Sequence, residues 1–181
     1  MTRDATPDDR PLALAPLDEK VDHVRGSPAG HVIIEYGDYE CPYSRQAFHA
    51  IERVEQQLGG DMRFAFRHFP LTAIHPHALA AAAAAEAAAL QGRFWDMHEL
   101  LFHRQKALED GDLRGYAAEL ALDVAAFDRD RVSVAVVERI RRDVDSGRAS
   151  GQVLGTPTLF IDGAVHRGGY DPPTLRAALA P

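Results

Sequence analysis

Cys41 is the residue whose type and position most clearly indicate nucleophilic chemistry. It is the only cysteine among 181 residues, and the residue after it, Pro42, favours the first turn of a helix. At a helix N-terminus a thiol lies near backbone N–H groups without intrahelical partners, and the helix dipole favours negative charge. Both effects favour the nucleophilic thiolate, whereas the neighbouring Asp38 and Glu40 oppose it. The alternative for a lone cysteine is a buried structural role.

Ser44 lies three residues after Cys41 and should share its face of the helix. This spacing places the hydroxyl within reach of the sulfur as a hydrogen-bond donor. A serine cannot resolve a disulfide, and a single cysteine excludes an intrachain disulfide and a zinc site of several thiolates. Any sulfur chemistry therefore involves a second molecule.

The elements expected around the cysteine form a β-α-β unit. Residues 32–36 are an apolar run rich in β-branched side chains, which predicts a strand buried on both faces. A helix with an apolar stripe follows from Pro42 and should end at the glycines of residues 59–60. Residues 63–69 then alternate and predict a second strand, with Arg67 on its polar face.

The rest of the chain predicts helices and then a hairpin. Residues 71–150 contain no strand pattern and read as consecutive helices. Residues 158–161, the turn Asp162-Gly163 and a short second strand predict a hairpin, and Asp171 is suited to cap a final helix. We expect an α/β fold with an N-terminal arm at residues 1–16, a sheet-bearing domain at 17–70 and 151–181, and an inserted helical subdomain at 71–150.

Two short motifs in this order resemble the DsbA family of thioredoxin-fold proteins. They are Cys41-Pro42-Tyr43-Ser44 after a strand and Gly155-Thr156-Pro157-Thr158 before one. The similarity covers about residues 17–69 and 151–181, and the helical insertion falls where that family carries one. The resemblance implies a DsbA-like thioredoxin fold with Cys41 as the attacking cysteine, Pro42, Tyr43 and Ser44 completing the active-site motif, and Pro157 as a cis-proline facing it.

The resemblance also implies roles for Thr156 and Glu35. In such proteins the residue before the cis-proline, here Thr156, pairs through its backbone with the bound polypeptide or thiol substrate. Glu35, six residues before Cys41, matches a buried acid that relays protons, and burial raises a carboxyl pKa toward the range of a general base. The alternative for Glu35 is a surface position on a less buried strand. The tyrosines nearby are candidates for an apolar rim, with a core role for the first of them: Tyr36, Tyr39 and Tyr43.

This chain departs from the family at Ser44, where the working motif has a second cysteine. A mixed disulfide at Cys41 must then be released by an outside thiol. We expect a thiol-disulfide oxidoreductase that acts through one cysteine on disulfide-containing or glutathionylated proteins or small thiols, with glutathione as a possible co-substrate. A peroxide-sensing thiol, or a resolving cysteine replaced by design, fits the same residues.

Two other functions remain open. A thioredoxin-fold module that binds peptides or acts like a chaperone would keep the cis-proline groove without turnover, because a fold does not determine a function. A glutathione transferase of the related helix-inserted architecture is a third possibility, although such enzymes usually activate glutathione with a serine.

The histidines are weaker candidates for chemistry. His75-Pro76-His77 resembles a ligand pair, but histidines that flank a proline at a helix start are more often cap and surface residues. His98 and His103 are five residues apart and do not share a helical face. His68 ends a strand, and we expect it to be packed or solvated rather than catalytic. We propose no metal and no bound cofactor from the sequence.

Charge and composition exclude several classes of protein. The 27 acidic and 20 basic residues give a net charge of −7, and no basic stripe is present to neutralise phosphates, so we expect no nucleic-acid partner. No stretch approaches the ~20 apolar residues that span a bilayer. Residues 1–20 lack the apolar region of a signal peptide, which predicts a cytoplasmic protein if Met1 is its natural start. The oligomeric state is not indicated.

Overall fold

The fold is built on a five-stranded mixed sheet. A computed structural model describes residues 14–58 and 60–180, so most of the expected arm at residues 1–16 lies outside the described residues. The strand order is β1-β3-β2-β4-β5. The strands are β1 (His23–Gly26), β2 (His31–Gly37), β3 (Met62–His68), β4 (Thr158–Ile161) and β5 (Ala164–Val165). Only β2 and β3 pair in parallel, and the other neighbours are antiparallel.

The expected β-α-β unit is present as β2, α1 (Pro42–Leu58) and β3. From Ile33 onward β2 is buried on both faces, as its apolar sequence predicts. The interpretation of β3 is wrong at one position, because Arg67 is fully buried instead of facing solvent. No local pattern predicts β1, because the strand is short and carries two charged or polar side chains; only the fold shows its pairing with β3.

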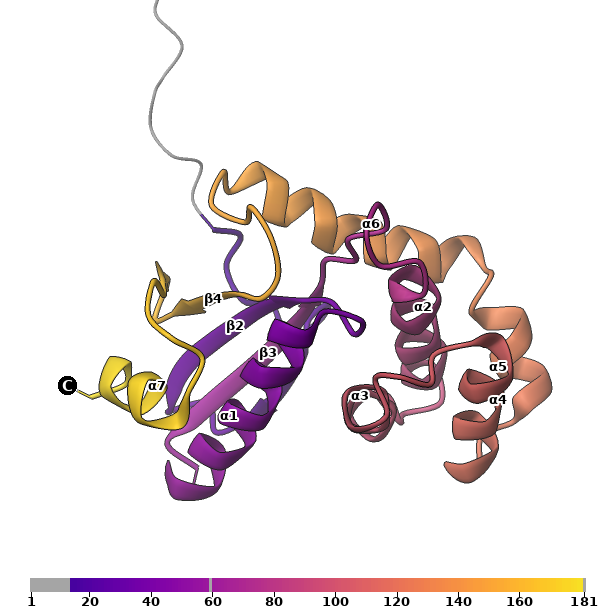
Figure 1. Cartoon of the computed structure of the whole chain (residues 1–181), viewed down its shortest axis with the longest axis horizontal. Helices are drawn as coiled ribbons and strands as arrows, with labels where there is room; N and C mark the ends of the chain where they lie inside the picture. Colours follow the sequence, from indigo (N-terminus) through magenta and orange to yellow (C-terminus); the bar gives the residue numbers. More distant parts are fainter. Residues whose placement is uncertain (1–13, 59, 181) are drawn as a thin grey trace, which may run out of the picture.

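Seven helices surround this sheet in the described part of the chain. Besides α1 they are α2 (Ala78–Ala89), α3 (Phe94–His103), α4 (Asp110–Glu119), α5 (Val124–Asp130), α6 (Val134–Ala149) and α7 (Pro172–Ala178). Figure 1 shows α2 to α5 grouped beside the sheet, with α6 running back along one side of it toward β4. All five helices from α2 to α6 therefore lie between β3 and β4 in sequence.

Local capping explains where several of these helices begin. Asp171 caps α7 by accepting a hydrogen bond from the Thr174 N–H, as its position before a proline predicts. At the start of α4, Glu109 and Asp112 form a capping box, and Asp110 is the first residue of the helix. In these cases the side-chain oxygen satisfies backbone N–H groups that have no partner inside the helix.

The two faces of the sheet carry separate apolar clusters. On one face Ile33, Phe64 and Phe66 pack against α1, α3 and α7. On the other face Ile34, Tyr36 and Phe160 pack with Val153 and the chain around Leu14 to Leu17. Because successive strand residues point to opposite faces, this alternation places Glu35 on the same face as Ile33, toward α1.

Candidate active site

Cys41 occupies the residue immediately before α1, where the sequence places it. Its carbonyl accepts the first helical hydrogen bond, from the Arg45 N–H at 3.1 Å. The residue is 3% exposed, and its thiol donates to the Thr156 carbonyl oxygen at 3.2 Å. The peptide bond between Thr156 and Pro157 is cis. The fold thus brings together a helix start and a strand start that lie 115 residues apart.

Ser44 does not interact with the sulfur in the way its spacing predicts. It is fully buried, and its hydroxyl oxygen accepts a hydrogen bond from the Asp38 N–H at 3.2 Å. Among the described residues the sulfur has its hydrogen bond with Thr156 instead. Ser44 therefore holds the loop between β2 and α1, because it caps a backbone group that burial would otherwise leave without a partner.

The three tyrosines near the motif do not form a common rim. Tyr36 is fully buried and Tyr39 is 1% exposed, whereas Tyr43 is 63% exposed. Tyr39 bonds to His98 Nδ1 at 3.0 Å inside the core. Only Tyr43 is placed to meet a substrate, and the expectation for Tyr39 is wrong because aromatic side chains surround it on several sides.

Glu35 is fully buried at the centre of the sheet, which excludes the surface alternative. It lies between Phe66 of β3 and Leu159 of β4. Neither carboxylate oxygen has a hydrogen-bond partner. Burial raises the pKa of Glu35 to about 8, although the positive charge of Arg25 acts in the opposite direction. A carboxyl group in this state can accept and release a proton near neutral pH.

Gly37 leaves the space that the Glu35 carboxyl group occupies. A Cβ atom at this position would lie 2.4 Å from the Phe66 ring and 2.9 Å from Glu35 Oε1. Any larger residue would therefore displace the aromatic ring or the acid. The glycine that marks the end of β2 in the sequence is required by this close packing.

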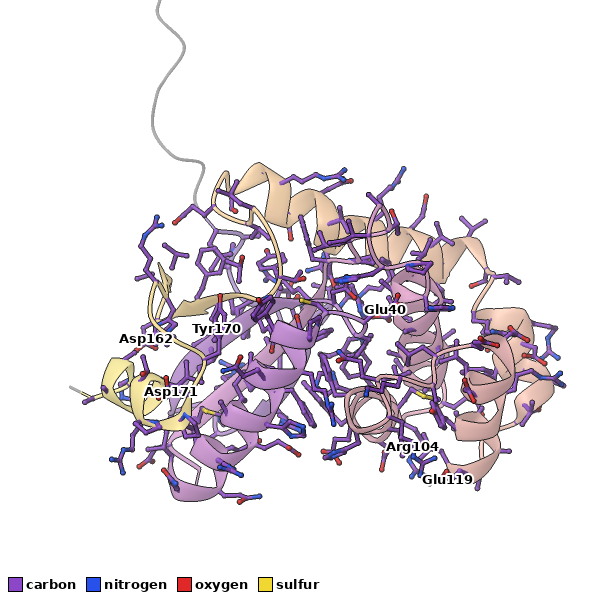
Figure 2. The ribbon with its side chains drawn as sticks, in the orientation of Figure 1. Glu40, Arg104, Glu119, Asp162, Tyr170 and Asp171 are labelled. Atoms are coloured by element: carbon purple, nitrogen blue, oxygen red, sulfur yellow. The ribbon has the colours of Figure 1, made fainter. Side chains whose placement is uncertain are left out.

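Tyr170 is a site residue that the sequence analysis missed. Its hydroxyl donates to the Pro157 carbonyl oxygen at 2.8 Å. The pKa of Tyr170 is raised by burial, and further by the negative charges of Glu35 and Cys41. Figure 2 shows Tyr170 near the end of the sheet that faces the start of α1. No local pattern around Tyr170 distinguishes it from a core tyrosine.

The acids next to the cysteine are both paired with histidines. Asp38 accepts hydrogen bonds from the Leu71 N–H and from His75 Nδ1, each at 2.8 Å. Glu40 accepts from the N–H and Nδ1 of His77, at 2.6 and 2.8 Å. The hydrogen bond that His77 donates to Glu40 raises the pKa of His77. The pair His75-Pro76-His77 thus fastens the segment before α2 to the active-site loop, and the two rings bind separate acids.

Gln105 holds the backbone of the cysteine, whereas Thr156 contacts its sulfur. Its amide nitrogen donates to the carbonyl oxygens of Tyr39 and Cys41, at 2.8 and 2.9 Å. Gln105 follows α3 by two residues and is 64 residues from Cys41 in sequence. No motif in the sequence indicates this contact.

One group in the described residues has the donor set of a metal site. His23, His68 and Glu86 lie within 4.8 Å of one another. Glu86 Oε1 already bonds to both rings, at 2.8 and 2.7 Å, and Arg139 lies 3.9 Å from the same oxygen. Burial raises the pKa of Glu86, but the hydrogen bonds from His23 and His68 outweigh it and the pKa is lowered. Glu86 is thus paired with two imidazole rings, and the Arg139 guanidinium lies near the same oxygen.

A cavity of about 400 Å³ surrounds the cis-proline. It is lined by apolar and polar side chains on both strands of the hairpin and the segment before it, including Leu154, Thr156, Pro157, Val165 and Tyr170. Leu154 is 91% exposed, and the Thr156 hydroxyl is buried without a partner. The groove can therefore take an extended peptide or a thiol, to which Leu154 offers an apolar contact and Thr156 a polar one.

In the described part of the chain, no helix is long and apolar enough to span a bilayer.

Curated relatives match nearly the whole chain. It is 45% identical over 169 residues to a protein named Na(+)/H(+) antiporter NhaA 1 from Mycolicibacterium gilvum, covering 92% of this chain and 27% of that protein. It is also 45% identical over 173 residues to Na(+)/H(+) antiporter NhaA from Herminiimonas arsenicoxydans, covering 94% of this chain and 27% of that protein. The chain therefore spans about a quarter of the length of the curated relatives it matches.

Solved structures and a family model agree on the fold. A thioredoxin-like oxidoreductase from Silicibacter pomeroyi is 25% identical, with a TM-score of 0.77 and 95% of each chain covered. Oxidised BdbD from Bacillus subtilis is 20% identical, with a TM-score of 0.79, and 93% of this chain and 95% of that chain are covered. The model described as DSBA-like thioredoxin domain matches residues 32–180. The chain therefore belongs to the family of DsbA-like thioredoxin domains.

Proposed function

We propose that this protein exchanges disulfides through Cys41 alone and that an external thiol, glutathione or one like it, completes each cycle. The observation that carries the proposal is the position of the single cysteine, which lies at the start of α1 with its sulfur 3.2 Å from the carbonyl before the cis-proline. The motif position where the family has a second cysteine holds Ser44. A second sulfur within the chain is thus not available to release a mixed disulfide.

The proposed cycle has two exchange steps. The Cys41 thiolate attacks one sulfur of a substrate disulfide, forms a mixed disulfide, and releases the other half of the substrate as a thiolate. A glutathione thiolate then attacks the partner sulfur of that mixed disulfide, which yields a new disulfide and regenerates the Cys41 thiolate. The external thiol supplies the two electrons that reduce the substrate disulfide, and no oxidant is required.

Three residues around the sulfur support these steps. The backbone of Thr156, held by the cis bond to Pro157, offers its groups to an incoming chain at the rim of the 400 Å³ cavity. Glu35 holds or releases a proton near neutral pH, because burial raises its pKa to about 8. Tyr170 fixes the cis-proline segment through the Pro157 carbonyl.

The decisive experiment compares the chain with its Cys41→Ser variant. We expect the unaltered protein to accelerate the reduction of a glutathionylated test peptide by glutathione, and Cys41→Ser to reduce the rate to that of the buffer. Mass spectrometry of the reaction should find a +305 Da adduct, roughly the mass of one glutathionyl group, on Cys41. Equal rates with both proteins would disprove the proposed function.

A second candidate is a peptide-binding module without turnover, which the groove around Pro157 favours. Its exposed Leu154 and the unpartnered Thr156 hydroxyl are features of a binding surface. Under this alternative, Cys41→Ser leaves peptide affinity unchanged and Thr156→Val lowers it several-fold. A calorimetric titration with an unstructured, cysteine-free peptide separates the two functions, since catalysis through Cys41 needs a sulfur in the ligand.

We also propose a cytoplasmic location, where small thiols are kept reduced and a one-cysteine cycle has its reductant. Fractionation of cells that express the untagged chain, followed by immunodetection, is the test. Recovery of the protein from an oxidising compartment would exclude reduced glutathione as the thiol that completes the cycle.

A further inference from the structure

A basic pocket lies beside Cys41, and Figure 2 shows Arg104 of this pocket and Tyr170 of the cis-proline groove on opposite sides of α1. It has a volume of about 340 Å³ and is lined by Arg45, His103, Arg104, Gln105, Lys106 and Ala107. These residues come from the first turn of α1 and from the end of α3 and the segment after it. The pocket shares no lining residue with the groove around Pro157.

Two contacts connect the pocket to the reactive residue. Gln105, which lines it, donates to the Cys41 carbonyl oxygen at 2.9 Å. Arg45, which also lines it, lies one helical turn after Cys41 and donates its N–H to the same carbonyl at 3.1 Å. Residues four apart on a helix have Cβ atoms about 6 Å apart, so a small molecule joined to the sulfur can reach the pocket.

The pocket carries positive charge that the protein does not neutralise. Among the described residues neither Arg45 nor Lys106 forms an ion pair, and the Arg45 Nε atom is buried without a hydrogen-bond partner. Arg104 is already held by Glu119 through two hydrogen bonds of 2.7 and 2.8 Å, and these two side chains lie together below α3 and α4 in Figure 2. Two cations are thus available in a chain whose net charge is −7.

We propose that this basic pocket binds the carboxylates of a glutathionyl group joined to Cys41, and so selects glutathionylated substrates over other disulfides. The proposal rests on the proposed function. Glutathione has two carboxylates, and guanidinium and ammonium groups are their natural partners. The substrate's own chain then leaves through the cis-proline groove.

With a glutathionylated substrate, the reaction at Cys41 consists of two thiol–disulfide exchanges. The Cys41 thiolate attacks the glutathione sulfur of the mixed disulfide, the bond between that sulfur and the substrate's own sulfur breaks, and the substrate departs as a thiolate. A new bond joins Cys41 to the glutathionyl sulfur, whose carboxylates lie against Arg45 and Lys106. A second glutathione thiolate attacks that sulfur, which releases oxidised glutathione and restores the Cys41 thiolate.

The test compares two mixed disulfides of one peptide, formed with glutathione and with 2-mercaptoethanol, which is neutral. The rate constant for attack by Cys41 is measured on each, and their ratio is the readout, because general changes in thiol reactivity cancel. We expect Arg45→Gln with Lys106→Gln to lower this ratio about tenfold, and Lys106→Gln alone to lower it about threefold. The matched control is Arg53→Gln with Arg141→Gln, two exposed arginines outside the pocket with the same change in net charge, and its ratio should not change.

The outcomes distinguish the two proposals. A ratio that is equal in the pocket variant, the control variant and the unaltered chain overturns the basic pocket as a recognition site. If the unaltered chain reacts with neither disulfide, the proposed function itself fails. If the pocket variant does not fold, Lys106→Gln decides, since its side chain is exposed and its removal disturbs no packing. High salt should lower the ratio of the unaltered chain toward that of the pocket variant.

Discussion

The burial of Glu35 provides a carboxyl group that titrates near neutral pH, but it also makes the folded protein less stable as the pH rises. Its carboxyl group has no hydrogen-bond partner and its pKa is raised to about 8 by burial. In the unfolded chain a glutamate releases its proton near its ordinary pKa of 4.5. Between these two values the folded state holds a proton that the unfolded state has lost, so the free energy of unfolding falls as the pH rises from about 4.5 to about 8.

We therefore expect Glu35→Gln to stabilise the protein increasingly as the pH rises. The difference from the unaltered chain should be small at pH 4.5, about 3 kcal/mol at pH 7, and constant above pH 8, since each pH unit in this window is worth about 1.4 kcal/mol. Urea unfolding at these pH values measures it. A difference independent of pH would show that Glu35 is not protonated in the native state. The same variant should slow disulfide exchange if the carboxyl group relays a proton.

Ser44 permits a test of the one-cysteine cycle at a single position. Ser44→Cys places a second sulfur on the same face of α1, one turn from Cys41. We expect this variant to release a mixed disulfide without added thiol and to form an intrachain disulfide, which thiol titration detects as the loss of two free thiols. Ser44→Ala is the control, since it also removes the hydrogen bond to the Asp38 N–H but adds no sulfur. Continued dependence on external thiol in Ser44→Cys would contradict the expected geometry.

At the scale of elements, α6 is fixed against the sheet at Gly147. A Cβ atom there would lie 3.0 Å from the Tyr36 ring and 3.1 Å from the Phe69 ring. Tyr36 cannot easily move, because its hydroxyl bonds to Ser146 at 2.9 Å and accepts from Arg67 at 2.9 Å. A side chain at this position would therefore press on both rings.

Alanine substitutions at two helical glycines should have opposite effects. Gly147→Ala should lower the free energy of unfolding by about 1 kcal/mol, because overpacking exceeds the gain in helix propensity. Gly115→Ala in α4, where a Cβ atom meets nothing within 4 Å, should raise it by about 1 kcal/mol. Thermal and urea unfolding of both variants checks the pair. Stabilisation by Gly147→Ala would mean that α6 can shift away from the sheet without loss.

At the scale of the whole molecule, Arg67 joins parts of the chain that local structure does not connect. It is fully buried on β3 and makes two hydrogen bonds with Asp22, at 3.1 and 2.8 Å. It also donates to the carbonyl oxygens of Ala15 and Pro16, at 2.8 and 2.9 Å. The described end of the expected arm is thus held against the sheet by a buried guanidinium.

Replacing Arg67 should destabilise the entire fold rather than one element. We expect Arg67→Met to lower the free energy of unfolding by about 3–5 kcal/mol, because Asp22 is left buried without its main partner. Burial alone would raise the pKa of Asp22, but the hydrogen bonds from Arg67 keep it lowered. The ionised carboxylate therefore stabilises the folded state, and this contribution to the free energy of unfolding is lost as the pH falls below 3.8. The exposed Arg148→Met is the control and should change stability by less than about 0.5 kcal/mol. Equal effects of the two substitutions would contradict the structural role of Arg67.

The local elements of the active site could be predicted from periodicity and capping. The buried strand at residues 32–36, the helix start at Pro42 and the N-cap at Asp171 follow from side chains within a few positions of each other. Cys41 at the helix start follows from the same local pattern. In each case neighbouring residues determine the backbone, so the pattern is readable before the fold is known.

Tertiary structure alone decided which side chains meet around the sulfur. Tyr170 reaches Pro157 and Gln105 reaches Cys41 from elements far away in sequence, and Ser44 turns to Asp38 instead of the sulfur. The strand β1 and the burial of Arg67 likewise depend on partners that no local pattern names. The sequence by itself determined where the reactive cysteine stands and which elements flank it, whereas packing between distant segments decided its partners, since burial and hydrogen bonding depend on what the fold brings into contact.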